Sequence, residues 1–201
     1  MSYKKADCDD YIRKWADWCS VHMTAPLALL PITSDYREQT IDAKSRNMIR
    51  KANRYFYYQT FNYNLHLGEI YEINISLPER QGKAMSQSYQ QYPTAIQIPY
   101  DLCNVVHRYV FVGGFDERGT LRAYCALAIV GEIAIINTII GHGANLSDGI
   151  MNGMIDYLVN YVGSTTGCKY LNYLDMINCS VGLASFKSSV GFESIKEDFE
   201  Y

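Results

Sequence analysis

Apolar residues recur three or four positions apart in several stretches of the first half of the chain, which predicts amphipathic helices. The predicted helices cover residues 9–21, 42–54 and 65–75. Asp42 stands near the start of the second one, as helix-capping residues do. Residues 55–63 are rich in aromatic residues and threonine, so we expect a strand there. Pro26 and Pro31 bracket an apolar segment that we interpret as a connector.

Residues 78–99 break this pattern, because they are polar and rich in Gln, Ser and Tyr. A loop of this length inside a compact domain usually has a function. Strand-like runs with short connections follow, which predict an antiparallel meander over residues 108–115, 120–130 and 133–140. The remaining predicted elements are a helix over 147–162, a strand over 170–176, a short helix over 183–189 and a closing strand over 192–199.

These elements predict an α/β (α+β) fold with a mixed, mostly antiparallel sheet and flanking helices. We expect one domain over residues 1–201. Within it, residues 1–100 form an elaborated, largely helical N-terminal part, and residues 101–201 form the core that contains the meander.

Composition supports a folded chain and limits its partners. Of the 201 residues, 48% are hydrophobic and 19% are charged, which excludes a disordered protein. The net charge of −3 argues against bulk electrostatic binding to nucleic acid. Tyrosine is unusually frequent, with 18 residues, eight of them between Tyr55 and Tyr100. These tyrosines indicate either the wall of a wet ligand cleft or a half-buried sheet edge.

The chain start and the cysteines bear on location and metal binding. Residues 1–10 lack the apolar run of a signal peptide, and no stretch reaches the roughly 18–20 apolar residues that span a bilayer. We therefore expect a cytoplasmic protein without a membrane segment. None of the six cysteines forms a CxxC pair, so we expect reduced thiols, with neither disulfides nor a bound metal.

Two local motifs follow the meander. The first is residues 146–154, and the second is Asn178 followed by residues 182–187 and 190–192. With the order strand, strand, strand, loop, helix, strand, helix, strand, these motifs resemble the GNAT acyltransferase superfamily and its FemAB-like relatives. The resemblance covers roughly the last 95 residues.

This resemblance implies acetyl-CoA as the cosubstrate, with its pyrophosphate at the start of the helix that the first motif opens. A helix N-terminus binds such a group through backbone N–H groups alone. Leu146 stands where the family usually has Arg or Gln, and Met151 where it has Gly or Ala. The alternative is an ordinary helix cap made by Ser147 or Asp148. The implied cofactor-binding residues are Ile139, Ile140, Gly141, Leu146, Ser147, Asp148, Gly149, Ile150, Met151, Asn178 and Lys187.

Acyl transfer to an amine needs a base, a held oxyanion and a proton for the leaving group. His142, at the end of the third meander strand, is the candidate general base, and Glu132 is the alternative. Asp175 is a candidate to orient His142 or to bind the amine. The alternative for Asp175 is a structural role, in which its side chain caps the next turn. Tyr173 is a candidate proton donor to the thiolate, because Phe186 and Lys187 occupy the place of the usual family tyrosine.

The acceptor side is less defined. Residues 44–54 carry five positive charges and no acid, which fits a solvated helix face or an anion site. The candidate substrate-binding residues are Glu72, Asn74, Arg80, Gln81 and Tyr89. Of these, Arg80 and Gln81 lie in a turn suited to gripping a phosphate or a sugar hydroxyl.

We therefore expect an acyl-CoA-dependent N-acetyltransferase that acts on a small-molecule amine, an amino-sugar or its nucleotide-linked form. In that reading, residues 1–100 bind the acceptor and residues 101–201 bind acyl-CoA. Two alternatives are a FemAB-like aminoacyl transferase, in which residues 44–58 form an RNA surface, and a catalytically inactive GNAT-fold binding module. A homodimer is left open.

Overall fold

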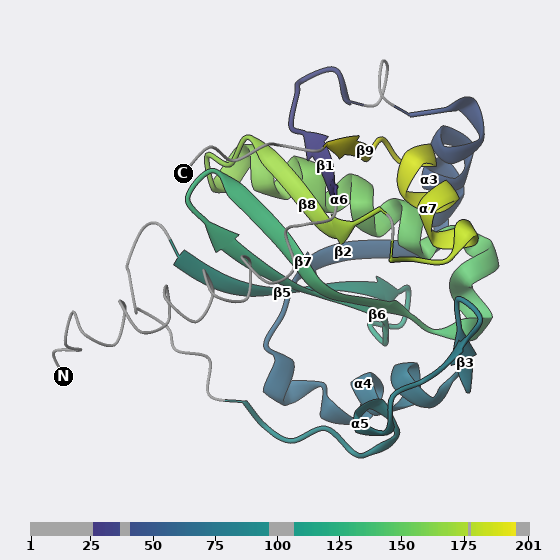
Figure 1. The fold of residues 1–201 in the computed structure, drawn as a ribbon. Coiled ribbons are helices and arrows are strands. Elements are labelled where there is room, and N and C mark those ends of the chain that lie inside the picture. Colours follow the sequence, from purple (N-terminus) through teal and green to yellow (C-terminus); the bar gives the residue numbers. More distant parts are fainter. Residues whose placement is uncertain (1–25, 37–40, 97–106, 177, 196–201) are drawn as a thin grey trace, which may run out of the picture.

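Seven strands form one mixed sheet in the computed structural model, which describes residues 26–36, 41–96, 107–176 and 178–195 (Figure 1). Their spatial order is β2-β5-β6-β7-β8-β1-β9. The strands are β1 (Leu27–Pro31), β2 (Phe56–Thr60), β5 (His107–Asp116), β6 (Leu121–Val130), β7 (Ile133–Gly141), β8 (Tyr170–Asp175) and β9 (Glu193–Ile195). Neighbouring strands are antiparallel except β7 and β8, which are parallel. A small separate hairpin joins β3 (Glu79–Arg80) to β4 (Lys83–Ala84).

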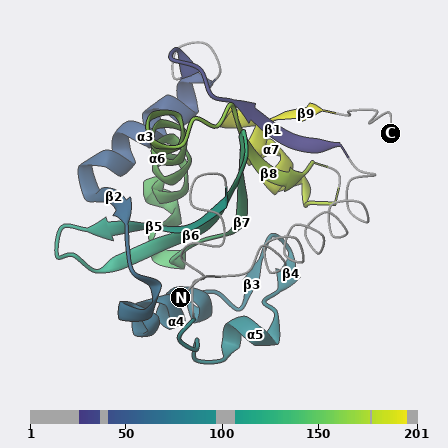
Figure 2. The same ribbon diagram turned by 90° about the vertical axis from the view of Figure 1, so that its left-hand side faces the viewer.

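Helices cover both faces of the sheet (Figure 2). They are α3 (Ala43–Tyr55), η1 (Tyr63–Leu65), α4 (Leu67–Ile75), α5 (Gln87–Gln90), η2 (Gly143–Asp148), α6 (Ile150–Thr165) and α7 (Val181–Ser189). Helix α6 packs on β2, β5, β6 and β7 and carries α3 beside it, whereas α4 packs on the opposite face against β6 and β7 and contacts α5.

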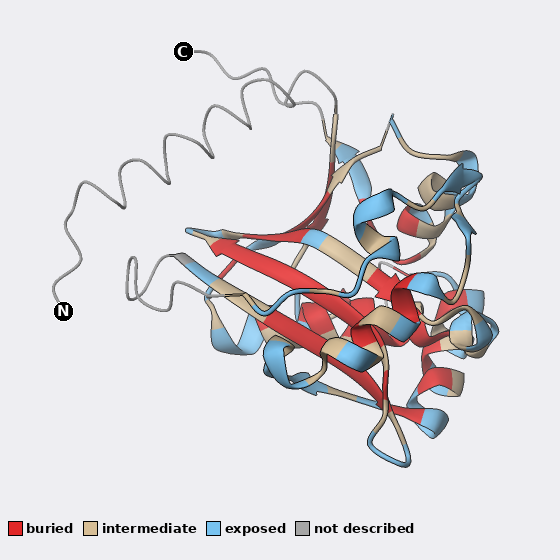
Figure 3. Cartoon of the chain, turned by 90° about the horizontal axis from the view of Figure 1, so that it is seen from below, coloured by how far each residue is buried: buried red, intermediate tan, exposed pale blue. Residues whose placement is uncertain are grey.

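Two apolar clusters hold these layers together, and Figure 3 shows that the buried residues follow the central strands. The larger cluster lies on the α3–α6 side and includes Ile49, Leu127 and Met154. The smaller one lies under α4 and includes Ile73 and Tyr124. Burial of each large apolar side chain contributes about 1.5–3 kcal/mol.

Most predicted elements are confirmed, including the meander β5–β6–β7 and the helix over 42–54. Asp42 caps that helix, because its side chain accepts a hydrogen bond of 2.6 Å from the Ser45 N–H. Helix α6 starts later than predicted, since the short helix η2 precedes it. The predicted helix over 9–21 and the end of the predicted closing strand lie outside the described residues.

The predicted connector between Pro26 and Pro31 is wrong, because Leu27–Pro31 is strand β1. It lies between β8 and β9 inside the sheet, and Ala28, Leu29 and Leu30 are all buried. A strand covered on both faces is uniformly apolar, so it lacks the alternation that marks a half-exposed strand. Pro31 ends the strand, a position where proline is tolerated.

The strands β7 and β8 diverge, and this divergence shapes the candidate site. Their pairing covers only Ile133–Ile135 and Tyr170–Asn172. Beyond it, β7 contains a bulge at Asn137, since Ala126 faces Thr138 and the next residue of β6 faces Ile136. A bulge bends its strand and increases its twist.

Candidate active site

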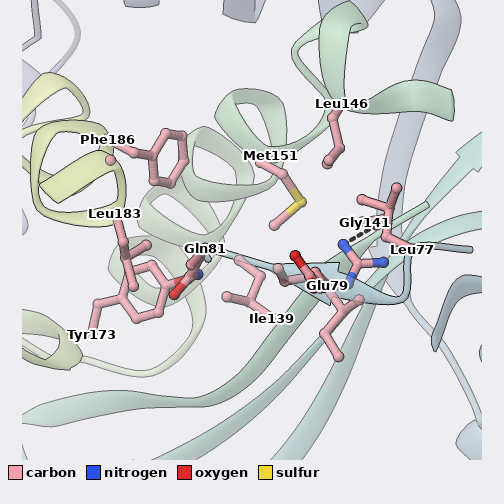
Figure 4. A pocket seen from close by; sticks show the side chains of 13 residues that line it. Leu77, Glu79, Gln81, Ile139, Gly141, Leu146, Met151, Tyr173, Leu183 and Phe186 are labelled. Carbon is pink, nitrogen blue, oxygen red and sulfur yellow. Dashed lines mark hydrogen bonds between the residues drawn. The ribbon is translucent and has the colours of Figure 1, made fainter. Parts of the chain in front are cut away.

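A cavity of about 300 Å³ lies where β7 and β8 separate (Figure 4). Its walls come from the end of β7, the β8–α7 region, the start of α6 and the β3–β4 hairpin. The residues that line it are Leu77, Glu79, Arg80, Gln81, Ile139, Ile140, Gly141, Leu146, Met151, Tyr173, Gly182, Leu183 and Phe186.

The β8 wall contains a backbone kink at Leu174, which has a φ of 56°. This left-handed conformation is costly for a residue with a Cβ, so neighbouring groups must hold it. The buried side chain of Asn172 does so. Its Oδ1 accepts from the Leu174 N–H at 3.0 Å, and its Nδ2 donates to the carbonyls of Leu174 at 3.2 Å and Ala28 at 3.3 Å.

Lys187 holds the same kink from the other side. Its side chain is 2% exposed, and Nζ donates to the carbonyls of Tyr173 at 2.7 Å and Asp175 at 2.6 Å. The ammonium group also lies 4.5 Å from the centroid of the Tyr173 ring, a cation–π contact. Burial lowers the pKa of Lys187. Lys187 therefore puts a positive charge behind the cavity wall rather than in the cavity itself.

The hairpin wall is attached to the end of β7 by Arg80. Its Nη1 donates to the Gly141 carbonyl at 2.9 Å, and Nη2 donates to the Ile73 carbonyl at 3.0 Å and to Ser76 Oγ at 3.1 Å. Ser76 Oγ in turn accepts from the Gly143 N–H at 2.9 Å. Desolvation lowers the pKa of Arg80. The predicted grip on a phosphate or sugar is thus replaced by a grip on the protein's own carbonyls.

The predicted pyrophosphate site lies at the start of α6. Gly149 has a φ of 79°, and a Cβ there would lie 2.6 Å from the Met48 carbonyl oxygen. The glycine therefore permits close packing against α3 and does not open the backbone to a phosphate. Lys51 is occupied as well, because Nζ bonds to the Ser147 carbonyl at 3.0 Å and to the Asp148 carboxylate at 2.9 Å.

The remaining side chains at this helix start give a diphosphate no cation either. Leu146 and Met151 point apolar side chains into the cavity, and Ile150 is buried with its carbonyl bound by the Tyr58 hydroxyl at 3.0 Å. The Asp148 carboxylate already pairs with Lys51. Among the described residues of this helix start no side-chain cation is therefore free for the diphosphate of acyl-CoA, which would rest on backbone N–H groups alone.

His142 lies just past β7 and is not among the lining residues. Its Nδ1 accepts a hydrogen bond of 3.2 Å from the Ala144 N–H, so the neutral ring carries its hydrogen on Nε2. Burial, Arg122 and Arg80 lower the pKa of His142, and Glu72 opposes that shift. In this arrangement the ring has no free lone pair for an amine proton, which argues against the general base predicted from sequence.

Several other predicted residues have structural partners away from the cavity. Asp175 accepts from the Asn178 N–H at 2.6 Å, the turn-capping alternative. Asn74 is buried and accepts from the Tyr124 hydroxyl at 2.8 Å. Glu72 is exposed and Tyr89 packs against the smaller core cluster. Glu132, the alternative base, pairs with Lys169 at 2.6 Å on the surface.

The structure therefore brings eight predicted residues to one cavity: Ile139, Ile140, Gly141, Leu146, Met151, Tyr173, Arg80 and Gln81. The lining residues Leu77 and Glu79 and the clamp made by Asn172 were not singled out from sequence. Leu183 and Phe186 belong to the second motif but were assigned no role in the site. Gly82 was a sequence signal for the turn that brings Glu79 to the cavity, because glycine readily adopts the positive φ of a tight hairpin, whereas Gln81 gave no such signal. Nothing local in the sequence marks Asn172, whose partners arise from the kink.

Comparison with known proteins finds no matching family model and no matching curated protein. Solved structures do match. FemX is 12% identical with a TM-score of 0.64, over 85% of this chain and 59% of FemX. A conserved protein of unknown function from Bacteroides thetaiotaomicron is 12% identical, with a TM-score of 0.54 over 90% of this chain and 63% of that one. L-PGS from Bacillus licheniformis is 14% identical, with a TM-score of 0.51 over 87% of this chain and 61% of L-PGS.

This chain thus spans about three fifths of the length of those structures. Within the described ranges, no helix is long and apolar enough to cross a membrane, and no three His, Cys, Asp or Glu side chains gather as a metal site. At these identities the likeness concerns the fold. The strand order, the diverging β7 and β8 and the likeness to FemX and L-PGS show that the chain has a GNAT-like, FemAB-like fold.

Proposed function

We propose that the protein is an N-acyltransferase that passes an acyl group from an aminoacyl ester to a primary amine. The divergence of β7 and β8 carries this proposal. Pairing ends at Ile135 and Asn172, and the cavity lies along the facing edge of β7 beyond that point. Backbone groups of such an edge are suited to pair with an extended donor and to stabilise an oxyanion.

The choice of donor follows from the start of α6, where no side-chain cation of the described residues is free to pair with the diphosphate of acyl-CoA. An aminoacyl ester on an RNA needs a different contact, with phosphodiester groups outside the cavity. Helix α3 packs against η2 beside the cavity and exposes Lys44, Arg50 and Arg54. This local positive face supports an RNA donor although the whole chain is slightly acidic. Acetyl-CoA, predicted from sequence, becomes the competing donor.

Tyr173 is the residue we assign to proton transfer. Its ring lines the cavity, and burial raises the pKa of its hydroxyl, which keeps it protonated. The amine nitrogen attacks the ester carbonyl carbon, the C–N bond forms and the C–O bond to the leaving oxygen breaks. The Tyr173 hydroxyl gives its proton to that oxygen, and the proton of the attacking nitrogen then restores the phenol.

The test is a transfer assay with two labelled donors and glucosamine as the amine. Total tRNA charged with radiolabelled amino acids is compared with radiolabelled acetyl-CoA. We expect N-acylated glucosamine from charged tRNA alone. Tyr173→Phe should lower turnover by about 100-fold or more, the usual scale for a lost general acid. Tyr170→Phe, an exposed position at the start of the same strand, is the matched control.

Each result decides between the three readings. Transfer from acetyl-CoA and not from charged tRNA would overturn the aminoacyl donor in favour of an acetyltransferase. Transfer from neither donor would overturn the enzyme and favour a binding module. Equal turnover of Tyr173→Phe and Tyr170→Phe would remove Tyr173 from the chemistry.

A further inference from the structure

We infer that the cavity is selective for an acyl group that carries both a cationic amine and an apolar side chain, and that the β3–β4 hairpin supplies the contact to the amine. The chemistry of the cavity walls supports this inference directly. The further statement that this ligand is the acyl group of the donor rests on the proposed function. In chemical terms, the ligand is an amino acid residue with a side chain of the size of leucine.

The apolar half of this selectivity comes from three elements. Ile139 of β7, Met151 of α6 and Phe186 of α7 line the cavity together. An acetyl group has three heavy atoms, which occupy about 90 Å³ if each takes the share of a water molecule. A cavity of about 300 Å³ with such walls has room for a branched hydrocarbon side chain as well.

The polar half comes from the hairpin. Figure 4 shows the side chains of Glu79 and Gln81 reaching the cavity from β3 and its turn. Arg80 also lines the cavity, but its terminal nitrogens donate to Gly141, Ile73 and Ser76. The ammonium of Lys187 donates to two carbonyls of β8, behind the wall.

Among the charged side chains at the cavity, the carboxylate of Glu79 is therefore the one available to bind a ligand. Glu79 is exposed, and it is the one carboxylate among the lining residues of the described chain. A carboxylate on one wall and hydrocarbon on the others complement an ammonium group attached to an apolar chain.

The backbone of the turn gives a second, independent observation. Gln81 has a φ of 56° and Gly82 a φ of 75°, the positive values of a tight hairpin turn. Asn, Asp or Gly normally occupies the first of these positions, because other residues strain it. Glutamine there keeps an amide over the cavity at the cost of strain, and such strain concentrates at functional sites.

The experiment is an NMR titration of the full chain with three small probes. L-leucinamide carries both features, glycinamide lacks the apolar side chain, and N-acetyl-L-leucinamide lacks the ammonium group. We expect L-leucinamide to bind at least about 10-fold more tightly than either of the others. The shifts should centre on Ile139, Gly141 and Leu183.

Two variants assign the ammonium group to its partner. Glu79→Gln should bind L-leucinamide and N-acetyl-L-leucinamide equally, whereas Glu117→Gln, an exposed change in the β5–β6 turn, should keep the wild-type preference. Equal binding of the two probes by the wild type, an unchanged preference in Glu79→Gln, or shifts outside the cavity would each overturn the inference. Selective binding without any transfer in the assay above would overturn the proposed enzyme and leave this amine site standing.

Discussion

Two walls of the cavity are built on opposite principles. The β8–α7 wall is part of the core, where the buried side chains of Asn172 and Lys187 hold the kink at Leu174. The β3–β4 hairpin is exposed, has two residues per strand and is attached to β7 through Arg80. The core wall thus sets the shape of the cavity, whereas the hairpin can change its chemistry at little cost to folding.

The largest effect on the core wall is expected from Lys187→Met. Methionine fills a similar volume but leaves the carbonyls of Tyr173 and Asp175 without their donor. An unsatisfied buried polar group costs about 1–3 kcal/mol, so we expect unfolding to become easier by about 2 kcal/mol. The relaxed wall should also lower turnover by at least about 10-fold. Urea unfolding and the transfer assay measure the two effects.

Lys169→Met is the matched control, because Lys169 forms only an exposed surface pair with Glu132. We expect no measurable change in it. An unchanged urea midpoint in Lys187→Met would show that the buried ammonium does not hold the core wall.

A smaller effect is expected from Asn172→Ala, which removes the other clamp of the kink. Without that side chain the Leu174 N–H loses its acceptor, and unfolding should become easier by about 1–2 kcal/mol. Adding Leu174→Gly should recover about 1 kcal/mol, because glycine adopts a positive φ without a Cβ clash. Chemical unfolding of the single and double variants checks this. A double variant no more stable than Asn172→Ala would mean that strain at Leu174 is not what Asn172 offsets.

The same contrast explains how much could be predicted from sequence. The meander and α3 could be predicted because periodicity and the cap at Asp42 are local signals. Ile139, Gly141 and Tyr173 were implied by the resemblance to GNAT acyltransferases, and they line the cavity. The role of Arg80 was missed, since its partner Gly141 lies 61 residues away. Gly149 was misread because the carbonyl it faces belongs to Met48, a contact that only packing creates.

For the hairpin wall, Arg80→Met should separate binding from stability. The Gly141 carbonyl loses one donor, whereas the Ile73 carbonyl keeps the Ser76 hydroxyl and N–H, and Ser76 Oγ keeps the Gly143 N–H. The variant also removes the buried Nε, which has no hydrogen-bond partner within the described residues. These effects offset each other, so we expect a stability change below about 1 kcal/mol. Hydrogen exchange at Lys83 and Ala84 should nevertheless speed up, and L-leucinamide should bind several-fold more weakly.

Arg118→Met, exposed in the β5–β6 turn, is the control for that loss of charge. If Arg80→Met destabilised the whole chain as much as Lys187→Met, the hairpin would belong to the core and the two walls would not differ in kind.

The smallest effect on turnover is expected from His142→Asn, just past the end of β7 and outside the lining of the cavity. Asparagine supplies an oxygen where Nδ1 now accepts from the Ala144 N–H, so the cap is kept while the titrating ring is lost. Because the ring in this tautomer has no lone pair for a substrate, turnover should stay within about 3-fold of wild type. A loss of about 100-fold would restore His142 as the general base.

Stability against pH gives the same substitution a second readout. Burial, Arg122 and Arg80 lower the pKa of His142 in the folded chain, against the weaker opposing effect of Glu72. Below the ordinary value of 6.5 the unfolded chain therefore binds more protons than the folded one, and the unfolding free energy falls as the pH drops. His142→Asn lacks this pH-dependent loss of stability. Its unfolding free energy relative to wild type should therefore rise as the pH drops from 7.5 to 5.5, as measured by urea titrations. A constant stability difference between the variant and the wild type across that range would contradict this. It would mean that His142 has the same pKa in the folded and unfolded chain, and that Arg122 and Arg80 do not affect it.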